Sequence, residues 1–198
     1  MNDVVELSYR RRPSSLRYML RGVIPTRRSG DLSPQIVARW NDHRVDPRQL
    51  ASFLEITGLP AGPELPLPYP HVFGFRLAMA VLTHPAFPVP IWRVLQTRNH
   101  LTQHRPIPVE SAMDLECRVL AGRPTAKGAE FDLRTTVHVD SALAWESLVT
   151  FFTRDRELNR VNFQVPTIRT YFALAALLDV ELDENGNPAR CAIVSTAS

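Results

Sequence analysis

Cysteine is scarce in this sequence, which holds only Cys117 and Cys191. The two are far apart and belong to no spaced set of cysteines and histidines, so the sequence contains neither a disulfide framework nor a metal-binding motif. Cys117 stands in an alternating apolar stretch, beside Leu115 and Val119. We therefore expect Cys117 to be a core residue, and we expect no metal and no cofactor.

Long hydrophobic runs are also missing. No segment reaches the roughly 18 consecutive apolar residues that a membrane-spanning helix requires. The opening residues, MNDVVELSYRRR, lack the apolar stretch of a secretory signal peptide. These two absences predict a cytoplasmic protein without a membrane partner.

Lysine is almost absent, because Lys127 is the only lysine among 23 basic residues. That bias is typical of a GC-rich genome and is not evidence for a binding site. Seven arginines nonetheless lie between Arg10 and Arg28 with no acid among them. Such a cluster suits nucleic acid, an anionic membrane or the phosphates of a carrier cofactor, or it is a solvated arm. No nucleic-acid recognition motif accompanies the charge, so we expect no nucleic acid and assign residues 1–34 to a basic N-terminal arm.

The composition is that of a globular protein with a core. The chain has 198 residues, of which 44% are hydrophobic and 22% charged. This length suits one domain, or a domain and a smaller appendage. We place the main domain at residues 35–160 and a C-terminal extension at 161–198, where residues 165–180 could form a helix.

A short helix is predicted at residues 47–57, where apolar side chains recur at helical spacing. Asp46 suits the N-cap and Pro47 the first helical position, and Gly58 is a plausible stop. Residues 60–70 then hold five prolines. We read them as a stiff, extended connector.

A second helix, predicted at residues 72–82, is apolar almost all round, with Arg76 as its only charge. A helix of this kind is enclosed by other structure. Three long regions with strand character follow, at residues 92–105, 113–123 and 131–154. One buried helix and a long antiparallel sheet predict an α+β protein whose sheet curls around the helix, an arrangement like the hot-dog fold.

Four motifs carry a resemblance to a known family: VDPRQLASFLEITGLP, LPLPYPHVFGFRLAMAVLT, FPVPIWRVLQTRNHLTQHRPI and WESLVTFFTR. Together they resemble the MaoC-like hydratases and dehydratases of acyl thioesters. More narrowly, they are similar to the non-catalytic amino-terminal half of members with two hot dogs in one chain. The similarity runs from about Pro13 to Arg154, and the second and third motifs are its most specific part.

The resemblance implies an acyl thioester ligand, carried by coenzyme A or an acyl carrier protein. In the family, an Asp and a His spaced Asp-x4-His before the central helix hold a water, and N–H groups at the start of that helix polarise the thioester oxygen. This chain has no Asp-x4-His pair there. Asp42 and His43 are adjacent, so we expect their side chains to point in different directions. The fold and ligand class therefore carry over, whereas the family's hydratase residues do not.

Several residues at the start of the central helix are candidates for the site. His71 is a candidate acid/base, because an imidazole near a helix N-terminus is biased toward its neutral form, although it could simply cap the helix. Tyr69 could offer its hydroxyl to the pocket or pack as an aromatic staple. Gly74 allows a ligand to approach backbone N–H groups closely, and with Phe73 it is a candidate substrate-binding residue.

A polar cluster on the following strand supplies further candidates. The period of two places Asn99 on one face and His104 on the other. His100 and His104 would stand about 13 Å apart, too far to hold one metal ion. We take Asn99 and His104 as further catalytic candidates and Arg105 as a substrate-binding candidate.

Three functions remain open from the sequence. The first is a hydratase or dehydratase of fatty-acid or polyketide metabolism, a lyase that works alone or with a partner subunit supplying the Asp/His pair. The second is a hot dog redeployed as a polyketide cyclase or isomerase. The third is a non-catalytic acyl-binding subunit. Because a lone hot-dog sheet leaves edge strands exposed, we expect a homodimer or a heterodimer with a related hot dog.

Overall fold

The computed structural model describes residues 4–10, 12–13, 18 and 32–154. Five of the seven arginines between Arg10 and Arg28 lie outside the described residues. So does the predicted extension at 161–198, with its helix at 165–180.

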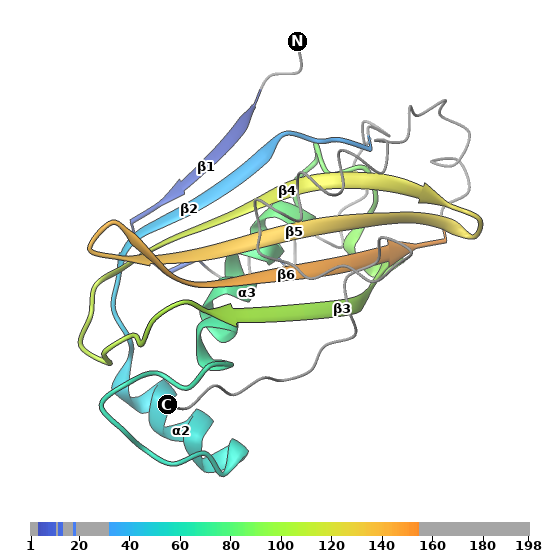
Figure 1. The fold of residues 1–198 in the computed structure, drawn as a ribbon. Coiled ribbons are helices and arrows are strands. Elements are labelled where there is room, and N and C mark those ends of the chain that lie inside the picture. The colour runs from blue at the N-terminus through green and yellow to red at the C-terminus, as the bar shows by residue number, and fades with distance from the viewer. Residues whose placement is uncertain (1–3, 11, 14–17, 19–31, 155–198) are drawn as a thin grey trace. The chain divides into compact units, whose positions relative to one another are not determined.

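The described residues form a six-stranded sheet in the order β1-β2-β4-β5-β6-β3 (Figure 1). Neighbouring strands are antiparallel, except that β1 and β2 are parallel. The predicted strand regions are confirmed as β3, β4 and the β5–β6 hairpin. The strands are β1 (Val5–Tyr9), β2 (Ile36–His43), β3 (Val94–Gln103), β4 (Met113–Thr125), β5 (Gly128–Val139) and β6 (Ala142–Thr153).

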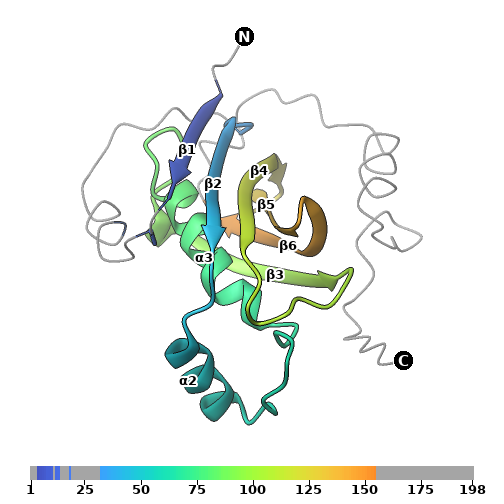
Figure 2. The ribbon, with the colours of Figure 1, turned by 90° about the vertical axis from the view of Figure 1, so that its left-hand side faces the viewer.

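The apolar helix α3 (Tyr69–Leu82) lies inside the curve of this sheet, against β2, β4 and β5 (Figure 2). Nine of its fourteen residues are buried. The helix begins three residues before the predicted start, because Pro70 is tolerated in a first helical turn, where its missing N–H would have no partner. The predicted α+β fold, a sheet curled around an apolar helix, is confirmed.

Alternation along the strands gives the sheet two faces. The inner face, toward α3, carries Cys117, Thr135 and Ser147 in one cross-strand row. Gly74 of α3 marks the close approach, since a Cβ at this position would lie 3.1 Å from Thr135 Cγ2. The opposite, outer face carries the residues that alternate with these, among them Glu116. Burial raises the pKa of the Cys117 thiol to about 12 and confirms it as a core residue.

The proline-rich connector fixes where α3 begins. Its Leu65 N–H donates to the Ile107 carbonyl at 2.8 Å. The Trp145 indole Nε1–H, on the inner face of β6, donates to the Leu67 carbonyl at 2.9 Å. Trp145 is fully buried, so this bond holds the connector on the sheet two residues before α3.

The helix α2 (Pro47–Thr57) has the predicted bounds and caps. The Asp46 carboxylate accepts a hydrogen bond from the Arg48 N–H at 3.0 Å. Gly58 adopts a left-handed φ of 68°, and its N–H donates to the Leu54 carbonyl. Both ends of the helix are therefore closed by the residues that the sequence indicated.

Two strands were not predicted, and they correct the domain boundary. Residues 1–34 were assigned to an arm, yet Val5–Tyr9 form β1 and pair with β2 over five residues. No strand was predicted before the helix at residues 47–57, yet Ile36–His43 form β2. The pattern of β2 was obscured by an irregularity between Trp40 and His43, which includes the positive φ of 53° at Asp42. The sheet domain therefore includes part of the predicted arm.

Deletion of residues 1–9 tests the role of β1. We expect the deletion to lower the free energy of unfolding by about 1–3 kcal/mol, because β2 loses its hydrogen-bonded neighbour. Urea denaturation followed by circular dichroism measures the change. The control is Glu6→Ala, which breaks only the exposed ion pair with Arg39 and should cost less than about 1 kcal/mol. An unchanged midpoint in the truncated protein would show that β1 contributes nothing.

Candidate active site

The structure brings two predicted site residues together at the start of α3. The Asn99 side-chain Nδ2, on β3, lies 3.4 Å from His71 Nε2 and donates a hydrogen bond to it. The contact joins residues 28 positions apart in the chain. Because Nε2 accepts, the neutral imidazole carries its proton on Nδ1. His71 is thus oriented by a neutral amide and remains partly exposed.

Burial lowers the pKa of His71 below its usual value. The sequence predicted a neutral imidazole from the helix N-terminus, whereas loss of solvation is the cause here. A neutral imidazole can accept one proton at Nε2 and release one from Nδ1. His71 can therefore serve as an acid or a base near neutral pH.

Tyr69 and Phe73 lie in a run of aromatic contacts along the other side of α3. Tyr69 packs edge-on against Phe53 of α2, with ring centroids 5.1 Å apart, and against Phe73 at 5.8 Å. Both residues are buried, and burial raises the pKa of the Tyr69 hydroxyl. This packing favours the aromatic-staple interpretation of Tyr69. Phe73, one turn further along α3, likewise lies in the packed interior.

His104 and Arg105 lie apart from His71. The His104 Nε2 is 3.0 Å from Glu146 Oε1, and Glu146 is directly opposite Thr136 in the sheet, on the outer face. The Arg105 guanidinium donates to the carbonyls of Val139 and Ala142, which flank the β5–β6 turn. His104 is thus not grouped with His71 and Asn99, and Arg105 fastens a hairpin, so the structure does not bring these two candidates to the start of α3. The sequence period had already placed His104 on the opposite face from Asn99.

His43 is a half-buried titratable residue that was not among the predicted site residues. Its ring lies between Trp40 and Phe73, with centroid distances of 4.1 and 4.7 Å. Burial lowers the pKa of His43 to about 4, and the charges of Arg12 and Arg76 add to the shift. Asp42 next to it is exposed, so the two side chains do point in different directions. His43 follows the inward-facing Trp40 by three residues, and this spacing was the available signal.

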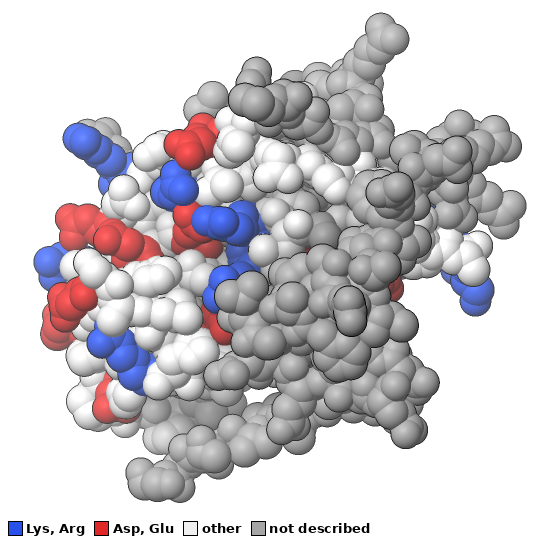
Figure 3. All heavy atoms as spheres, turned by 45° about the horizontal axis from the view of Figure 1, so that its top comes forward, with Lys and Arg blue, Asp and Glu red and all other residues white. Residues whose placement is uncertain are grey.

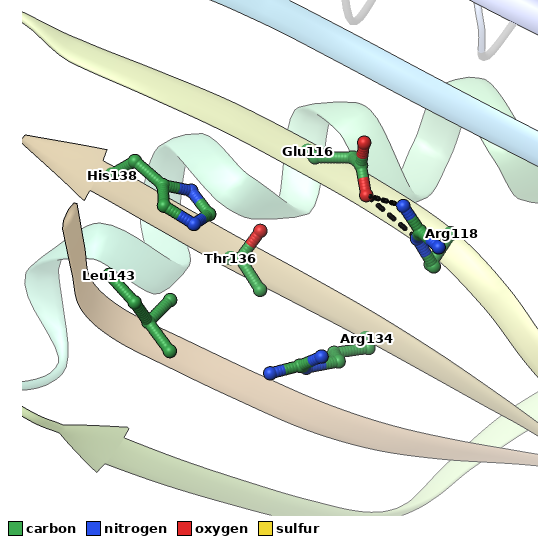
Figure 4. Close-up of a pocket in the computed structure, with 6 residues that line it drawn as sticks. All are labelled: Glu116, Arg118, Arg134, Thr136, His138 and Leu143. Atoms are coloured by element: carbon green, nitrogen blue, oxygen red, sulfur yellow. Dashed lines mark hydrogen bonds and ion pairs between the residues drawn. The ribbon is translucent and has the colours of Figure 1, made fainter. Parts of the chain in front are cut away.

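The outer face carries a network of ion pairs around a shallow hollow (Figures 3 and 4). In Figure 4 the residues lining the hollow stand on the near side of the sheet, with α3 behind it. Glu116 accepts from Arg39 and from Arg118, and Arg134 pairs with Glu146. Burial raises the pKa of Glu116, but the two arginines outweigh this effect and lower it overall. Acidic and basic residues are intermixed in Figure 3, so this hollow is a balanced charge network. The hollow is lined by Glu116, Arg118, Arg134, Thr136, His138 and Leu143.

The described residues contain no group of three or more His, Cys, Asp or Glu side chains placed to hold a metal ion. In the same part of the chain, no helix has the length and apolar content that a membrane crossing needs.

The low pKa of His43 predicts an acid-sensitive fold. The pKa of His43 in the unfolded chain is near 6.5. The stability that neutral His43 gives the folded protein is therefore present in full above that pH and is lost as the pH falls toward 4. Between pH 7 and pH 4, the wild type should lose about 1–2 kcal/mol more than His43→Phe, which does not titrate there. Urea unfolding of both proteins at several pH values measures this difference. Parallel pH profiles would contradict it.

Comparison with known proteins agrees with this architecture. The chain is 33% identical over 147 residues to 3-hydroxyacyl-thioester dehydratase X of Mycobacterium tuberculosis, an alignment that covers 73% of this chain and 52% of that protein. The crystal structure of the dehydratase HtdX of the same organism superposes with a TM-score of 0.56 and 32% identity, over 60% of this chain and 51% of HtdX. The chain therefore spans about half the length of these relatives.

A more distant structure shows the fold alone. The C-terminally truncated HadBC complex, a 3R-hydroxyacyl-ACP dehydratase of Mycobacterium tuberculosis, superposes with a TM-score of 0.50 and 14% identity, over 61% of this chain and 96% of the matched chain. No protein-family profile matches the sequence. The relationship therefore depends on the sequence identity between this chain and 3-hydroxyacyl-thioester dehydratase X, together with the sheet curled around α3. By both, the chain belongs to the MaoC-like family of hot-dog acyl-thioester hydratases and dehydratases.

Proposed function

We propose that the chain forms one half of a hydratase or dehydratase that acts on the acyl group of a thioester. The observation that carries this proposal is the His71–Asn99 pair at the start of α3. The relation to a 3-hydroxyacyl-thioester dehydratase supports the same class of reaction. The reaction adds water across the C2–C3 double bond of an enoyl thioester, or removes it from a 3-hydroxyacyl thioester.

His71 is the proton-transfer group that this chain offers. In dehydration, the C2 proton leaves to a base, the C3–O bond breaks, and the departing hydroxyl takes up a proton to become water. The neutral imidazole can supply or accept one of these protons, while Asn99 keeps the ring oriented. The positive end of the α3 dipole favours the negative charge that develops on the thioester oxygen. The Tyr69 and His71 N–H groups themselves donate within the chain, to the Pro66 and Pro68 carbonyls.

The second protic group must come from elsewhere, because the chain lacks the Asp-x4-His pair of the family. We propose that a second hot dog supplies it by pairing along β3. This strand is at the end of the sheet, and none of its ten residues is fully buried. The pairing would extend the sheet and close the site over His71.

Exposed apolar side chains along this edge support the same docking surface. Val72 and Phe75 of α3 are 43% and 40% exposed, and both are close in sequence to His71. Leu95 of β3 is 67% exposed and Trp92, just before β3, is 56% exposed. Exposed large apolar residues are typical of a protein interface. The partner is a second copy of this chain or a related hot-dog subunit.

The substrate carrier is coenzyme A or an acyl carrier protein, and the setting is fatty-acid or polyketide metabolism in the cytoplasm. The absent Asp-x4-His pair also favours a second candidate, an acyl-binding half whose partner performs all of the chemistry. In that case His71 contributes to the pocket without transferring a proton. Redeployment as a cyclase or isomerase would keep the same pocket and still use His71.

Replacement of His71 separates these candidates. In the assembled enzyme, His71→Asn should lower kcat for hydration of crotonyl-CoA by at least about 100-fold, because an acid/base group is removed. The control is His100→Gln. His100 is also on β3, but its side chain lies on the opposite face of the sheet from that of Asn99. Unchanged turnover in His71→Asn, with the fold intact by circular dichroism, would assign the chemistry to the partner half.

Charge placed on the β3 edge tests the docking surface. Leu95→Asp should dissociate the assembly into single subunits, because an unpaired carboxylate would be buried in the interface. Light scattering at tens of micromolar protein measures the mass. The control is Ile56→Asp, an exposed apolar residue on α2 that is not part of β3. A wild type that is a monomer in the presence of its candidate partner would contradict the proposal.

A further inference from the structure

Ser147 is a buried polar residue with no evident structural task. It is 1% exposed, and its hydroxyl Oγ has no hydrogen-bond partner among the described residues. Arg105 and Thr125 also have a buried polar atom without a hydrogen-bond partner, but both residues are partly exposed. A buried hydroxyl without a partner costs stability, so its presence calls for an explanation.

The sheet register places Ser147 on the same face as Asn99, close to the start of α3. On β6 it lies on the inner face, directly between Thr135 of β5 and Leu101 of β3. Asn99 pairs with Val149, two residues further along β6. Ser147 and Asn99 are therefore diagonal neighbours on one face, a relation that separates such residues by about 7–8 Å.

The helix bounds the same space from above. Gly74 lies over Thr135, the cross-strand neighbour of Ser147. His71, one turn earlier, reaches Asn99 on β3. A group held at the start of α3 would thus have His71 and Asn99 on one side and the Ser147 hydroxyl below it.

We propose that Ser147 is a substrate-contacting residue, whose hydroxyl donates a hydrogen bond to an oxygen of the acyl group. This assignment rests on the proposed function, because it requires an acyl thioester at the start of α3. Two oxygens have the required acceptor chemistry: the thioester carbonyl oxygen and the 3-hydroxyl oxygen.

Ser147→Ala should weaken binding while leaving stability unchanged or raised. The substitution removes a hydroxyl that no protein group satisfies, so folding loses no hydrogen bond. The matched control is Thr150→Ala on the same strand. Its hydroxyl donates to Asp132 Oδ1 at 2.7 Å, so its loss should lower the urea midpoint and leave ligand affinity unchanged.

Three probes identify the oxygen in the full-length protein with its native partner. Isothermal titration with coenzyme A, butyryl-CoA and 3-hydroxybutyryl-CoA compares ligands with neither oxygen, with the carbonyl alone and with both. If Ser147 binds the carbonyl, Ser147→Ala should weaken both acyl ligands by about 5- to 10-fold and spare coenzyme A. If it binds the 3-hydroxyl, only 3-hydroxybutyryl-CoA should be weakened to that extent.

The failures of the two proposals are distinguishable. Equal affinities of the wild type and Ser147→Ala for all three probes, with the wild type preferring acyl forms, would overturn the role of Ser147 alone. A wild type that binds the acyl forms no better than coenzyme A would overturn the proposed function and with it this assignment. A fall in the urea midpoint of Ser147→Ala as large as that of Thr150→Ala would mark the hydroxyl as structural.

Discussion

The enclosure of α3 by the sheet is the constraint on which the rest of the structure depends. Nine residues of α3 are buried, and each of the larger apolar side chains among them, such as Phe73 and Leu77, contributes about 1.5–3 kcal/mol through removal of apolar surface from water. That burial requires the sheet to curve, and Gly74 to approach Thr135 closely. The bond from Trp145 to the Leu67 carbonyl then fixes where the helix begins. His71 reaches Asn99 because both the start and the path of the helix are set.

Because side chains alternate along the strands, the polar groups that pair with one another lie on the outer face of the sheet, and those near the candidate site lie on the inner face. On the outer face, Glu116, Glu146 and their arginines satisfy one another and leave little for a ligand. On the inner face, the polar groups are few and small, and they lie close to the first turn of α3. A site with a few polar groups on an otherwise apolar surface is what an acyl chain with one polar end requires.

Much of this architecture could be predicted from local sequence. The all-apolar helix, the alternating strands, and the Asp46 and Gly58 caps are local signals, and each appears in the structure. The pairing of His71 with Asn99 could not be predicted, because it depends on strand order and register across 28 residues. The strand β2 was missed because its irregular end at Asp42 interrupts the period of two. His43 was missed because its burial comes from α3, a contact distant in sequence.

Among the described residues β3 has a neighbouring strand on one side only, and the proposed pairing along its other side has a consequence in dilute solution. A second hot dog linked on the same chain would meet this edge at a millimolar effective concentration, whatever the dilution. A separate subunit must instead find it by collision, so the fraction of completed sites would follow the total amount of both chains. Specific activity per chain would then fall on dilution and recover on concentration. The abundance of the partner would thereby set the output of the enzyme without any allosteric ligand.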